Sequence, residues 1–189
     1  MIAILGAGPH GREIAEVARV LGHDLFFYDD DPDVASLGPI RLAAGRPWVA
    51  GAAWPEVRRK ILEQAAPQEA ATLTHPTATI GTDTRLERGV VVAAGAHLGI
   101  NVAVGEHAHV GMGATVSRDV RIGGCVTLCP NSAVAGGVII EDDVFVGIGA
   151  VIAHELVIAA GALIGAGAVV VEDVAPGQVV VGNPARPLR

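Results

Sequence analysis

A glycine-rich turn near the start of the chain carries the clearest pattern for binding a phosphate. Residues 6–11 read Gly-Ala-Gly-Pro-His-Gly, a G-x-G-x-x-G spacing between an apolar run, residues 2–5, and a helix predicted over residues 12–21. Backbone N–H groups at the start of a helix, together with the helix dipole, attract phosphate, and glycine lets that phosphate approach closely. The turn therefore predicts a phosphate site, with a plain strand-to-helix turn as the alternative.

An acidic pair follows the next predicted strand. Residues 25–28 form that strand, and Asp29 and Asp30 come directly after it. A carboxylate at this place is typical of dinucleotide sites, where it binds a ribose hydroxyl. Fewer than about 75 residues precede the repeats described below, roughly half of a complete dinucleotide-binding domain. A nucleotide-linked sugar therefore fits the segment better than NAD, which remains an alternative.

Two other groups of reactive residues give weaker signals. Cys125 and Cys129 are the only cysteines, and no second pair completes a zinc site. We expect two buried, unreactive thiols. Residues 141–143 read Glu-Asp-Asp and could hold a cation, but such residues usually line a solvated turn in repeats of this kind. We predict no metal site.

Composition excludes several classes of partner. The net charge is −7 without any basic block, so nucleic acid and anionic membranes are poor partners. Aromatic residues make up 3% of the chain, too few for base-stacking platforms. Apolar stretches stop well short of the roughly 20 residues of a membrane span, and the start lacks a basic flank and a cleavage site. We expect a cytoplasmic protein.

A period of six organises the rest of the chain. It fits neither a helix nor a half-buried strand, and it marks a hexapeptide-repeat parallel β-helix. Three six-residue sides make a coil of eighteen residues, so the series spans about five coils, each rising roughly 4.8 Å. The sixteen aliphatic residues of the unbroken series are Ile80, Leu86, Val92, Leu98, Val104, Val110, Val116, Ile122, Leu128, Val134, Ile140, Val146, Ile152, Ile158, Ile164 and Val170.

The residue after each aliphatic is usually small. Gly99, Gly105 and Gly123 are examples, and glycine suits a tight corner where a larger side chain would clash. The outer faces are rich in Val and Ala, which favours burial against a neighbouring subunit. The sequence thus predicts two domains: a small α/β, Rossmann-like domain over residues 1–72, with a second helix at 56–64, and a β-helix over residues 73–189.

These motifs resemble the sialic acid O-acetyltransferase and bacterial amino-sugar N-acetyltransferase family of left-handed β-helix acyltransferases. The glycine turn, residues 27–32, residues 74–78, the hexapeptides and residues 181–186 match the family in order, over nearly the whole chain. The resemblance implies a left-handed prism, a homotrimer, and acetyl-CoA as acyl donor in a groove between neighbouring prisms. It also implies that the N-terminal domain holds a sugar or nucleotide-sugar.

The resemblance assigns residues to both ligands. Those expected at the sugar nucleotide's phosphates and nucleoside are Gly8, His10, Gly11, Asp29 and Asp30. Those expected along acetyl-CoA, from the thioester to the adenine nucleotide, are Thr127, Gly136, Ile148, Ala166, Pro184 and Arg186.

The catalytic motif of the family is changed in this chain. In that family a histidine removes the proton of the nucleophile, and a following Asp or Glu orients the histidine. With the repeats in register, the pair falls on Arg118 and Asp119. Arginine stays protonated at physiological pH, so Arg118 cannot be the general base. A second family histidine, at the thioester, falls on Thr127.

His109 is our candidate for the missing base. It stands eighteen residues before Thr127, hence one coil away in the same column. His154, thirty-six residues after Arg118, would lie two coils or about 10 Å away, which is far for one site. His97 and His107 also take outward positions. A solvated surface imidazole is the alternative for each histidine.

Other routes remain open for the proton. Asp119 could act as a weak base or bind a substrate ammonium, and Arg118 could pair with it or grip a carboxylate or phosphate. An amine could also lose its proton to solvent, with the protein acting by positioning alone.

We therefore predict an acetyl-CoA-dependent acyltransferase that modifies an amino or hydroxyl group of a sugar or nucleotide-linked sugar, without a metal. The main alternative is a non-catalytic protein that binds a nucleotide or acyl-CoA on the same scaffold. Arg118 and Thr127 are the features that favour this alternative.

Overall fold

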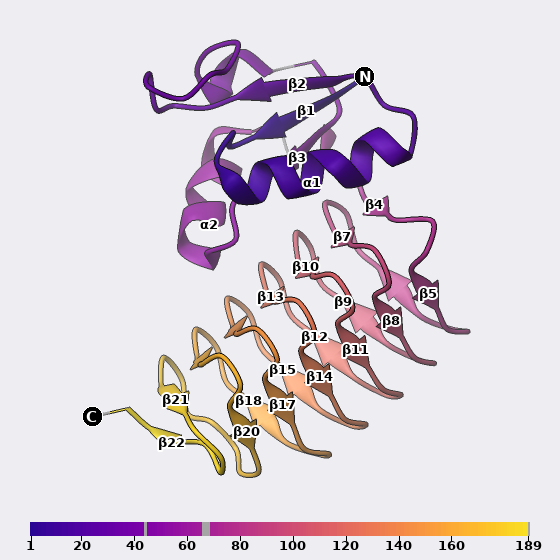
Figure 1. The fold of residues 1–189 in the computed structure, drawn as a ribbon, viewed down its shortest axis with the longest axis vertical. Helices are drawn as coiled ribbons and strands as arrows, with labels where there is room; N and C mark the ends of the chain where they lie inside the picture. Colours follow the sequence, from indigo (N-terminus) through magenta and orange to yellow (C-terminus); the bar gives the residue numbers. More distant parts are fainter. Residues whose placement is uncertain (44, 66–68, 189) are drawn as a thin grey trace.

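The protein is a stack of short-stranded coils with an α/β segment packed beside its first coils (Figure 1). The computed structural model describes residues 1–189 except 44, 66–68 and 189. The N-terminal segment lies at one end of the stack, and a C-terminal strand pair lies at the other. No helix in the described part of the chain is long and apolar enough to cross a membrane.

The N-terminal segment is built on a parallel sheet with the strand order β2-β1-β3. The first helix starts at Pro9, three residues earlier than predicted, because proline's fixed φ suits the first helical turn. The second starts one residue early for the same reason, at Pro55. The bounds are β1 Ile2–Leu5, α1 Pro9–Val20, β2 Leu25–Tyr28, a 3₁₀-helix Ile40–Ala43, β3 Trp48–Ala50 and α2 Pro55–Gln64.

Three sheets form the sides of the stack, and we call them the first, second and third solenoid sheets. The first contains β4 Leu73–Thr74, β7 Val91–Val92, β10 His109–Val110, β13 Thr127–Leu128, β16 Phe145–Val146, β19 Leu163–Ile164, β21 Val179–Val181 and β22 Arg186–Pro187. The second contains β5 Thr79–Ile80, β8 His97–Leu98, β11 Thr115–Val116, β14 Ala133–Val134, β17 Val151–Ile152 and β20 Val169–Val170. The third contains β6 Arg85–Leu86, β9 Ala103–Val104, β12 Arg121–Ile122, β15 Ile139–Ile140 and β18 Val157–Ile158.

The predicted repeat is confirmed in register and in burial. Neighbouring strands from β4 to β20 pair residues eighteen apart, as His109 pairs with Thr127, whereas β19 and β21 pair residues sixteen apart. The aliphatic series fills the interior, and Leu98 and Ile158 are fully buried. Ile80 departs from this, with 37% of its surface exposed, because the second solenoid sheet begins with its strand and no earlier strand covers it.

The corner glycines act through close stacking rather than through an unusual φ. An ideal Cβ on Gly123 would lie 2.6 Å from the backbone nitrogen of Asp142 in the next coil, and one on Gly105 would lie 2.6 Å from the carbonyl carbon of Gly123. The residue with a positive, left-handed φ comes two positions after the corner glycine. His107 follows Gly105 in this way with φ 58°, and Cys125 follows Gly123 with φ 55°. The sequence thus predicted the clash, but the actual turn sits further along each corner.

The first solenoid sheet carries the N-terminal segment. Helix α1 packs between β1 and β4, and Ile14 and Val17 share an apolar cluster with Leu73. Trp54 stacks on Phe145 with ring centroids 4.3 Å apart. These contacts place the start of α1 and the start of α2 directly over the coils that carry the candidate site.

Candidate functional site

The glycine turn is as compact as its sequence suggests. Gly6 has φ +105°, a conformation that favours glycine. A Cβ on Gly11 would collide with the carbonyl oxygen of Gly6, and one on Gly51, just after β3, would collide with the same oxygen. The turn from β1 into α1 therefore depends on three glycines, one of them contributed by β3's end.

The acidic pair after β2 braces this turn. The Asp29 carboxylate accepts hydrogen bonds from the backbone N–H of Ala7 at 2.7 Å and of Asp31 at 2.9 Å. Asp30 accepts from the N–H of Ile40 at 3.1 Å and from the Gln64 amide at 2.8 Å. Both carboxylates thus hold the loops that surround the turn.

A cavity of about 570 Å³ opens beside the turn, and we call it the turn pocket. Of the residues expected at a sugar nucleotide, Gly8, His10 and the acidic pair line this cavity, whereas Gly11 is not among the lining residues. Lys60 and Trp54 also line it. Sequence reasoning missed both, because Trp54 precedes α2, Lys60 lies within it, and no motif links that helix to the turn.

A second cavity, of about 390 Å³, lies between α1 and the first solenoid sheet, and we call it the α1 cleft. Its lining is mostly aliphatic and includes Thr127 and Ile148. His109 and His10 contribute imidazoles to the same wall. The α1 cleft and the turn pocket share Pro9, His10 and Ala53, so the two cavities meet at the first turn of α1.

His10 and His109 are joined across this meeting point. His10 Nε2 lies 3.0 Å from His109 Nδ1, and His10 Nδ1 lies 3.2 Å from a carboxylate oxygen of Glu13. Burial, and next the charge of Arg58, lower the pKa of His10 and lower that of His109 well below its usual value. Both imidazoles are therefore neutral at pH 7. His109 is 3% exposed, so the prediction of an outward position holds but N-terminal residues cover it.

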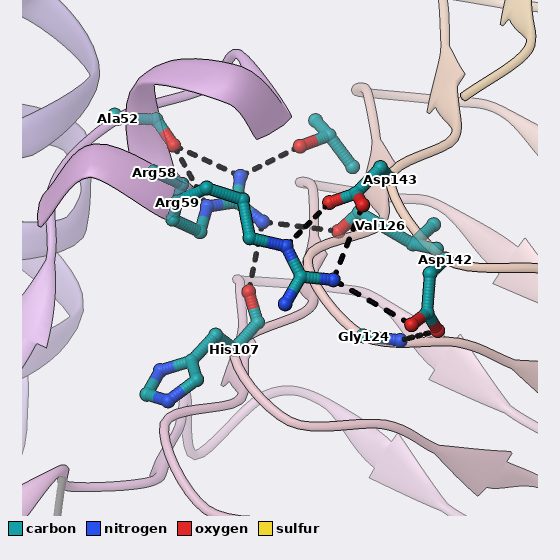
Figure 2. Close-up of polar contacts among 9 residues, drawn as sticks. Ala52, Arg58, Arg59, His107, Gly124, Val126, Asp142 and Asp143 are labelled. Carbon is teal, nitrogen blue, oxygen red and sulfur yellow. Dashed lines mark hydrogen bonds and ion pairs between the residues drawn. The ribbon is translucent and has the colours of Figure 1, made fainter. Parts of the chain in front are cut away.

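Arg58 of α2 is a fully buried cation at the centre of this interface (Figure 2). It donates to the carbonyl oxygens of His107 at 2.8 Å and Val126 at 3.2 Å in the solenoid, and of Ala52 at 2.9 and 3.0 Å in its own segment. Burial lowers its pKa to about 10, which still leaves it protonated at neutral pH. Sequence reasoning missed Arg58 as well, because its partners lie in segments that are distant in the chain.

Thr127 is held by the same network. Its hydroxyl accepts a hydrogen bond from Arg58 at 2.6 Å and donates one to the carbonyl oxygen of Ala53 at 2.6 Å. The residue is buried. Thr127 thus lies at the α1 cleft, but its hydroxyl is already engaged within the protein.

The acidic run at residues 141–143 is an ion-pair and turn element. Arg59 donates to Asp143 at 2.7 Å and lies 3.5 Å from Asp142, and Asp142 also accepts from the N–H of Gly124 at 2.7 Å (Figure 2). Glu141 accepts from a backbone N–H one coil on. Among the described residues no group of histidine, cysteine and carboxylate side chains could hold a metal ion.

Arg118, Asp119 and Gly136 form a separate group at the corner between the second and third solenoid sheets. Asp119 accepts from the Asn101 amide at 2.8 Å, and Arg118, 65% exposed, lies 3.5 Å from the Asp119 carboxylate. The N–H of Gly137 donates to the Arg118 carbonyl. Neither cavity of the single chain includes this corner.

Ile148 and Ala166 lie one coil apart at the corner between the first and second solenoid sheets. Gly167 donates its N–H to the Ile148 carbonyl at 2.8 Å, and Ile148 is exposed. Pro184 precedes β22, which pairs antiparallel with β21, and Arg186 of β22 lies 3.6 Å from Glu172. These residues predicted for acetyl-CoA therefore follow the outside of the stack toward its C-terminal end.

Cys125 and Cys129 differ in burial. Cys125 is buried, whereas Cys129 is partly exposed and lines the α1 cleft. Burial raises the pKa of both thiols, that of Cys129 to about 11. Both are protonated at neutral pH, which fits the prediction of unreactive thiols.

Solved structures similar to this chain cover almost its whole length. PerB from Caulobacter crescentus, in complex with CoA and GDP-perosamine, is 29% identical, with 100% of this chain and 97% of that chain covered and a TM-score of 0.93. The acetyltransferase domain of PglB from Neisseria gonorrhoeae, also solved with acetyl coenzyme A, is 30% identical, with 99% and 98% covered and a TM-score of 0.91.

WeeI from Acinetobacter baumannii is 28% identical, with 100% of this chain and 99% of that chain covered and a TM-score of 0.90. No protein-family model and no curated protein sequence matches the chain. The three structures match the chain over both the repeats and the N-terminal segment. The chain belongs to the left-handed β-helix, hexapeptide-repeat acyltransferase family that includes these sugar N-acetyltransferases.

Proposed function

We propose that the protein transfers the acetyl group of acetyl-CoA to the amino group of a sugar linked to a nucleoside diphosphate. The observation that carries this proposal is the meeting of two cavities at His10. One cavity has the glycine turn and a lysine, which suit a diphosphate, and the other is apolar and lies on the solenoid. The similarity to PerB, solved in complex with CoA and GDP-perosamine, supports a protein that takes both kinds of ligand.

The sugar nucleotide is proposed to bind in the turn pocket. Gly8, His10 and Gly11 would lie at the phosphates, where the backbone at the start of α1 favours anions. Asp29 and Asp30 would face the nucleoside, and Lys60 adds a cation at the pocket wall. In this proposal residues 1–72 form a reduced Rossmann-like domain, and residues 73–189 form the acyltransferase domain.

Acetyl-CoA is proposed to lie along the outside of the solenoid. Its expected contacts fall at two different corners: Gly136 lies at one, and Ile148 and Ala166 lie at the other. A groove between two neighbouring prisms of a homotrimer would bring these corners together. The residues proposed along this groove, from the thioester to the adenine nucleotide, are Thr127, Gly136, Ile148, Ala166, Pro184 and Arg186.

The reaction needs a proton acceptor and a group that stabilises negative charge. The amine attacks the thioester carbonyl, the C–S bond breaks, CoA leaves as the thiol, and the nitrogen loses one proton. We propose that His109 accepts this proton, because Arg118 is a permanent cation and cannot act as a base. Arg118 would hold an anionic group of a ligand, and Asp119 would orient Arg118 or bind the substrate ammonium.

A second candidate function is supported by one observation. The hydroxyl of Thr127, at the position expected beside the thioester, donates its single hydrogen to the carbonyl oxygen of Ala53 and accepts from Arg58, so it has no hydrogen left to donate to a ligand. A protein that binds acyl-CoA and a sugar nucleotide without turnover would need no free group there.

The test is calorimetric binding of acetyl-CoA, followed by CoA release on adding UDP- and GDP-linked amino sugars to the same sample. Acceptor-dependent release supports acetyl transfer. Binding of both ligands without release supports the second candidate, and no binding of either ligand contradicts both.

A further inference from the structure

Three neighbouring side chains that line the α1 cleft run from a buried position to an exposed one. His109 lies on the first solenoid sheet, His10 lies in the first turn of α1, and Glu13 lies one turn further along that helix. The ring of His109 is 3.0 Å from that of His10 between nitrogens, and His10 is 3.2 Å from the Glu13 carboxylate. Exposure rises along the series: His109 is buried, the His10 side chain is 26% exposed, and that of Glu13 is 61% exposed.

The bonding pattern fixes where the hydrogens lie. An ionised carboxylate only accepts, so His10 carries its hydrogen on Nδ1 and donates it to Glu13. A neutral His10 then has a lone pair on Nε2, so His109 donates from Nδ1. A neutral His109 has its lone pair on Nε2. That nitrogen is buried and has no hydrogen-bond partner among the described residues.

The surroundings keep both rings neutral before a substrate binds. Arg58 from α2 and His107 from the adjoining corner face His109, and Arg58 also acts on His10. Among the described residues, Glu13 is the carboxylate that acts on His10, and it favours the protonated ring. Burial outweighs it, so the pKa of His10 is lowered. The series is therefore able to accept a proton at neutral pH.

We propose that His109, His10 and Glu13 form a proton relay that carries the proton of the acceptor amine from the α1 cleft to solvent. This inference rests on the proposed acetyl transfer. In this relay His109 receives the proton first, His10 passes it on, and Glu13 releases it to solvent. The unpartnered acceptor on His109 is the feature that points to a ligand, because buried polar atoms normally have partners.

The relay balances in protons and electrons. The nitrogen that has attacked the thioester gives its proton to His109 Nε2 as the amide forms and the CoA thiolate leaves. His109 passes its Nδ1 proton to His10 Nε2, and His10 passes its own Nδ1 proton to the Glu13 carboxylate. Solvent takes that proton from exposed Glu13, and solvent also protonates the thiolate. After this transfer both rings carry their hydrogen on Nε2 instead of Nδ1. Proton exchange with solvent then returns both rings to the starting tautomer.

The decisive variant is His109→Asn. An asparagine amide can occupy the place of the Nδ1–H group and donate to His10, but it cannot accept and pass on a proton. The relay predicts that His109→Asn and His109→Ala both lose about 100-fold in kcat, the low end for general acid–base catalysis. Affinity for acetyl-CoA and for the sugar nucleotide, measured by calorimetry, stays unchanged. The acid limb of the wild-type kcat profile, below pH 6.5, disappears in His109→Asn.

His97→Asn is the matched control, because His97 is an exposed histidine on β8 outside both cavities. It should leave the rate and the pH profile unchanged. A His109→Asn variant with the wild-type rate and profile would show that His109 only positions His10, and would overturn the relay. If the wild type binds both ligands and releases no CoA, the proposed function itself fails.

Nitrogen-15 NMR of the histidine rings tests the same inference without turnover. The relay predicts that His10 and His109 are both neutral at pH 7 with hydrogen on Nδ1, the less common tautomer in free histidine. In Glu13→Gln the preference at His10 weakens, because the amide can also donate. Hydrogen on Nε2 of either ring in the wild type would contradict the proposed direction of the path.

Discussion

At the scale of single residues, Arg58 holds the N-terminal segment against the solenoid. Its guanidinium supplies the donors for carbonyl groups on both sides of the interface, and it also fixes Thr127. A buried cation is costly unless all its donors are used, and here five N–H groups meet several acceptors. Arg58 thus sets the distance between α2 and the coils that form the candidate site.

Replacing Arg58 by methionine should lower the free energy of unfolding by about 3 kcal/mol or more, because the buried carbonyl groups of His107 and Val126 lose their donor. Arg59→Met is the matched control. Arg59 is partly exposed and its ion pair with Asp143 is worth less than about 1 kcal/mol. Urea unfolding of both variants checks this, and equal losses would contradict the role given to Arg58.

His107 should make the stability of the protein depend on pH. Burial lowers its pKa from 6.5 to about 4 in the folded state. The unfolded chain therefore binds more protons between these values, so stability is fully present above pH 6.5 and falls as pH drops toward 4, by at most about 3 kcal/mol. His107→Asn keeps a residue that tolerates the φ of 58° at this corner. Unfolding at pH 7 and pH 4.5 should show a smaller pH effect in the variant, and an identical effect would refute this assignment.

Residue roles were the least predictable part of the site. The glycine turn and the acidic pair follow from local spacing, since a strand-to-helix turn is a local structure. Arg58 could not be predicted, because its acceptors are brought to it only by tertiary packing. The burial of His107 and His109 was missed for the same reason: an outward position on a coil is exposed only if nothing packs over it.

At the scale of elements, the coil is defined by its period and by its corners. The period was predictable because each aliphatic residue has the same neighbours in every turn. The left-handed corner residue was not, because its position is occupied by Gly, Asn, Asp, His, Cys or Glu and so leaves no single signal. The starts of α1 and α2 differ from prediction by three residues and one, both at a proline.

Gly123 and Gly124 allow a matched test of coil stacking. A Cβ on Gly123 would lie 2.6 Å from backbone of the next coil, whereas the nearest atom to a Cβ on Gly124 is 3.5 Å away. We expect Gly123→Ala to cost more than about 2 kcal/mol, in the range of overpacked cores, and Gly124→Ala to cost less than about 0.5 kcal/mol. Thermal unfolding monitored by circular dichroism compares them. Similar melting temperatures would contradict the account of the corners.

At the scale of the whole molecule, the expected ligand residues are divided among three places. The turn pocket lies within the N-terminal segment and the α1 cleft lies between that segment and the solenoid, Arg118 and Gly136 lie at one corner, and Ile148, which also lines the α1 cleft, lies with Ala166 at another. The resemblance therefore predicted individual ligand-binding residues, but one chain alone does not bring them together into a single site. A groove shared by two subunits is the arrangement we propose.

The shared groove requires a trimer in solution. Light scattering after size exclusion should give a mass three times the 19.2 kDa of one chain. Ile148→Glu should weaken both the trimer and the affinity for acetyl-CoA, because an exposed apolar residue at the proposed groove becomes charged. A monomer that still binds acetyl-CoA would contradict the shared site.

Acetyl transfer is tested by identifying the product that the wild-type protein forms from acetyl-CoA and a GDP-linked amino sugar. We expect an N-acetylated sugar nucleotide, seen as a new amide by NMR, with one CoA released for each amide. Saturating binding of both ligands with no acetylated sugar would contradict it.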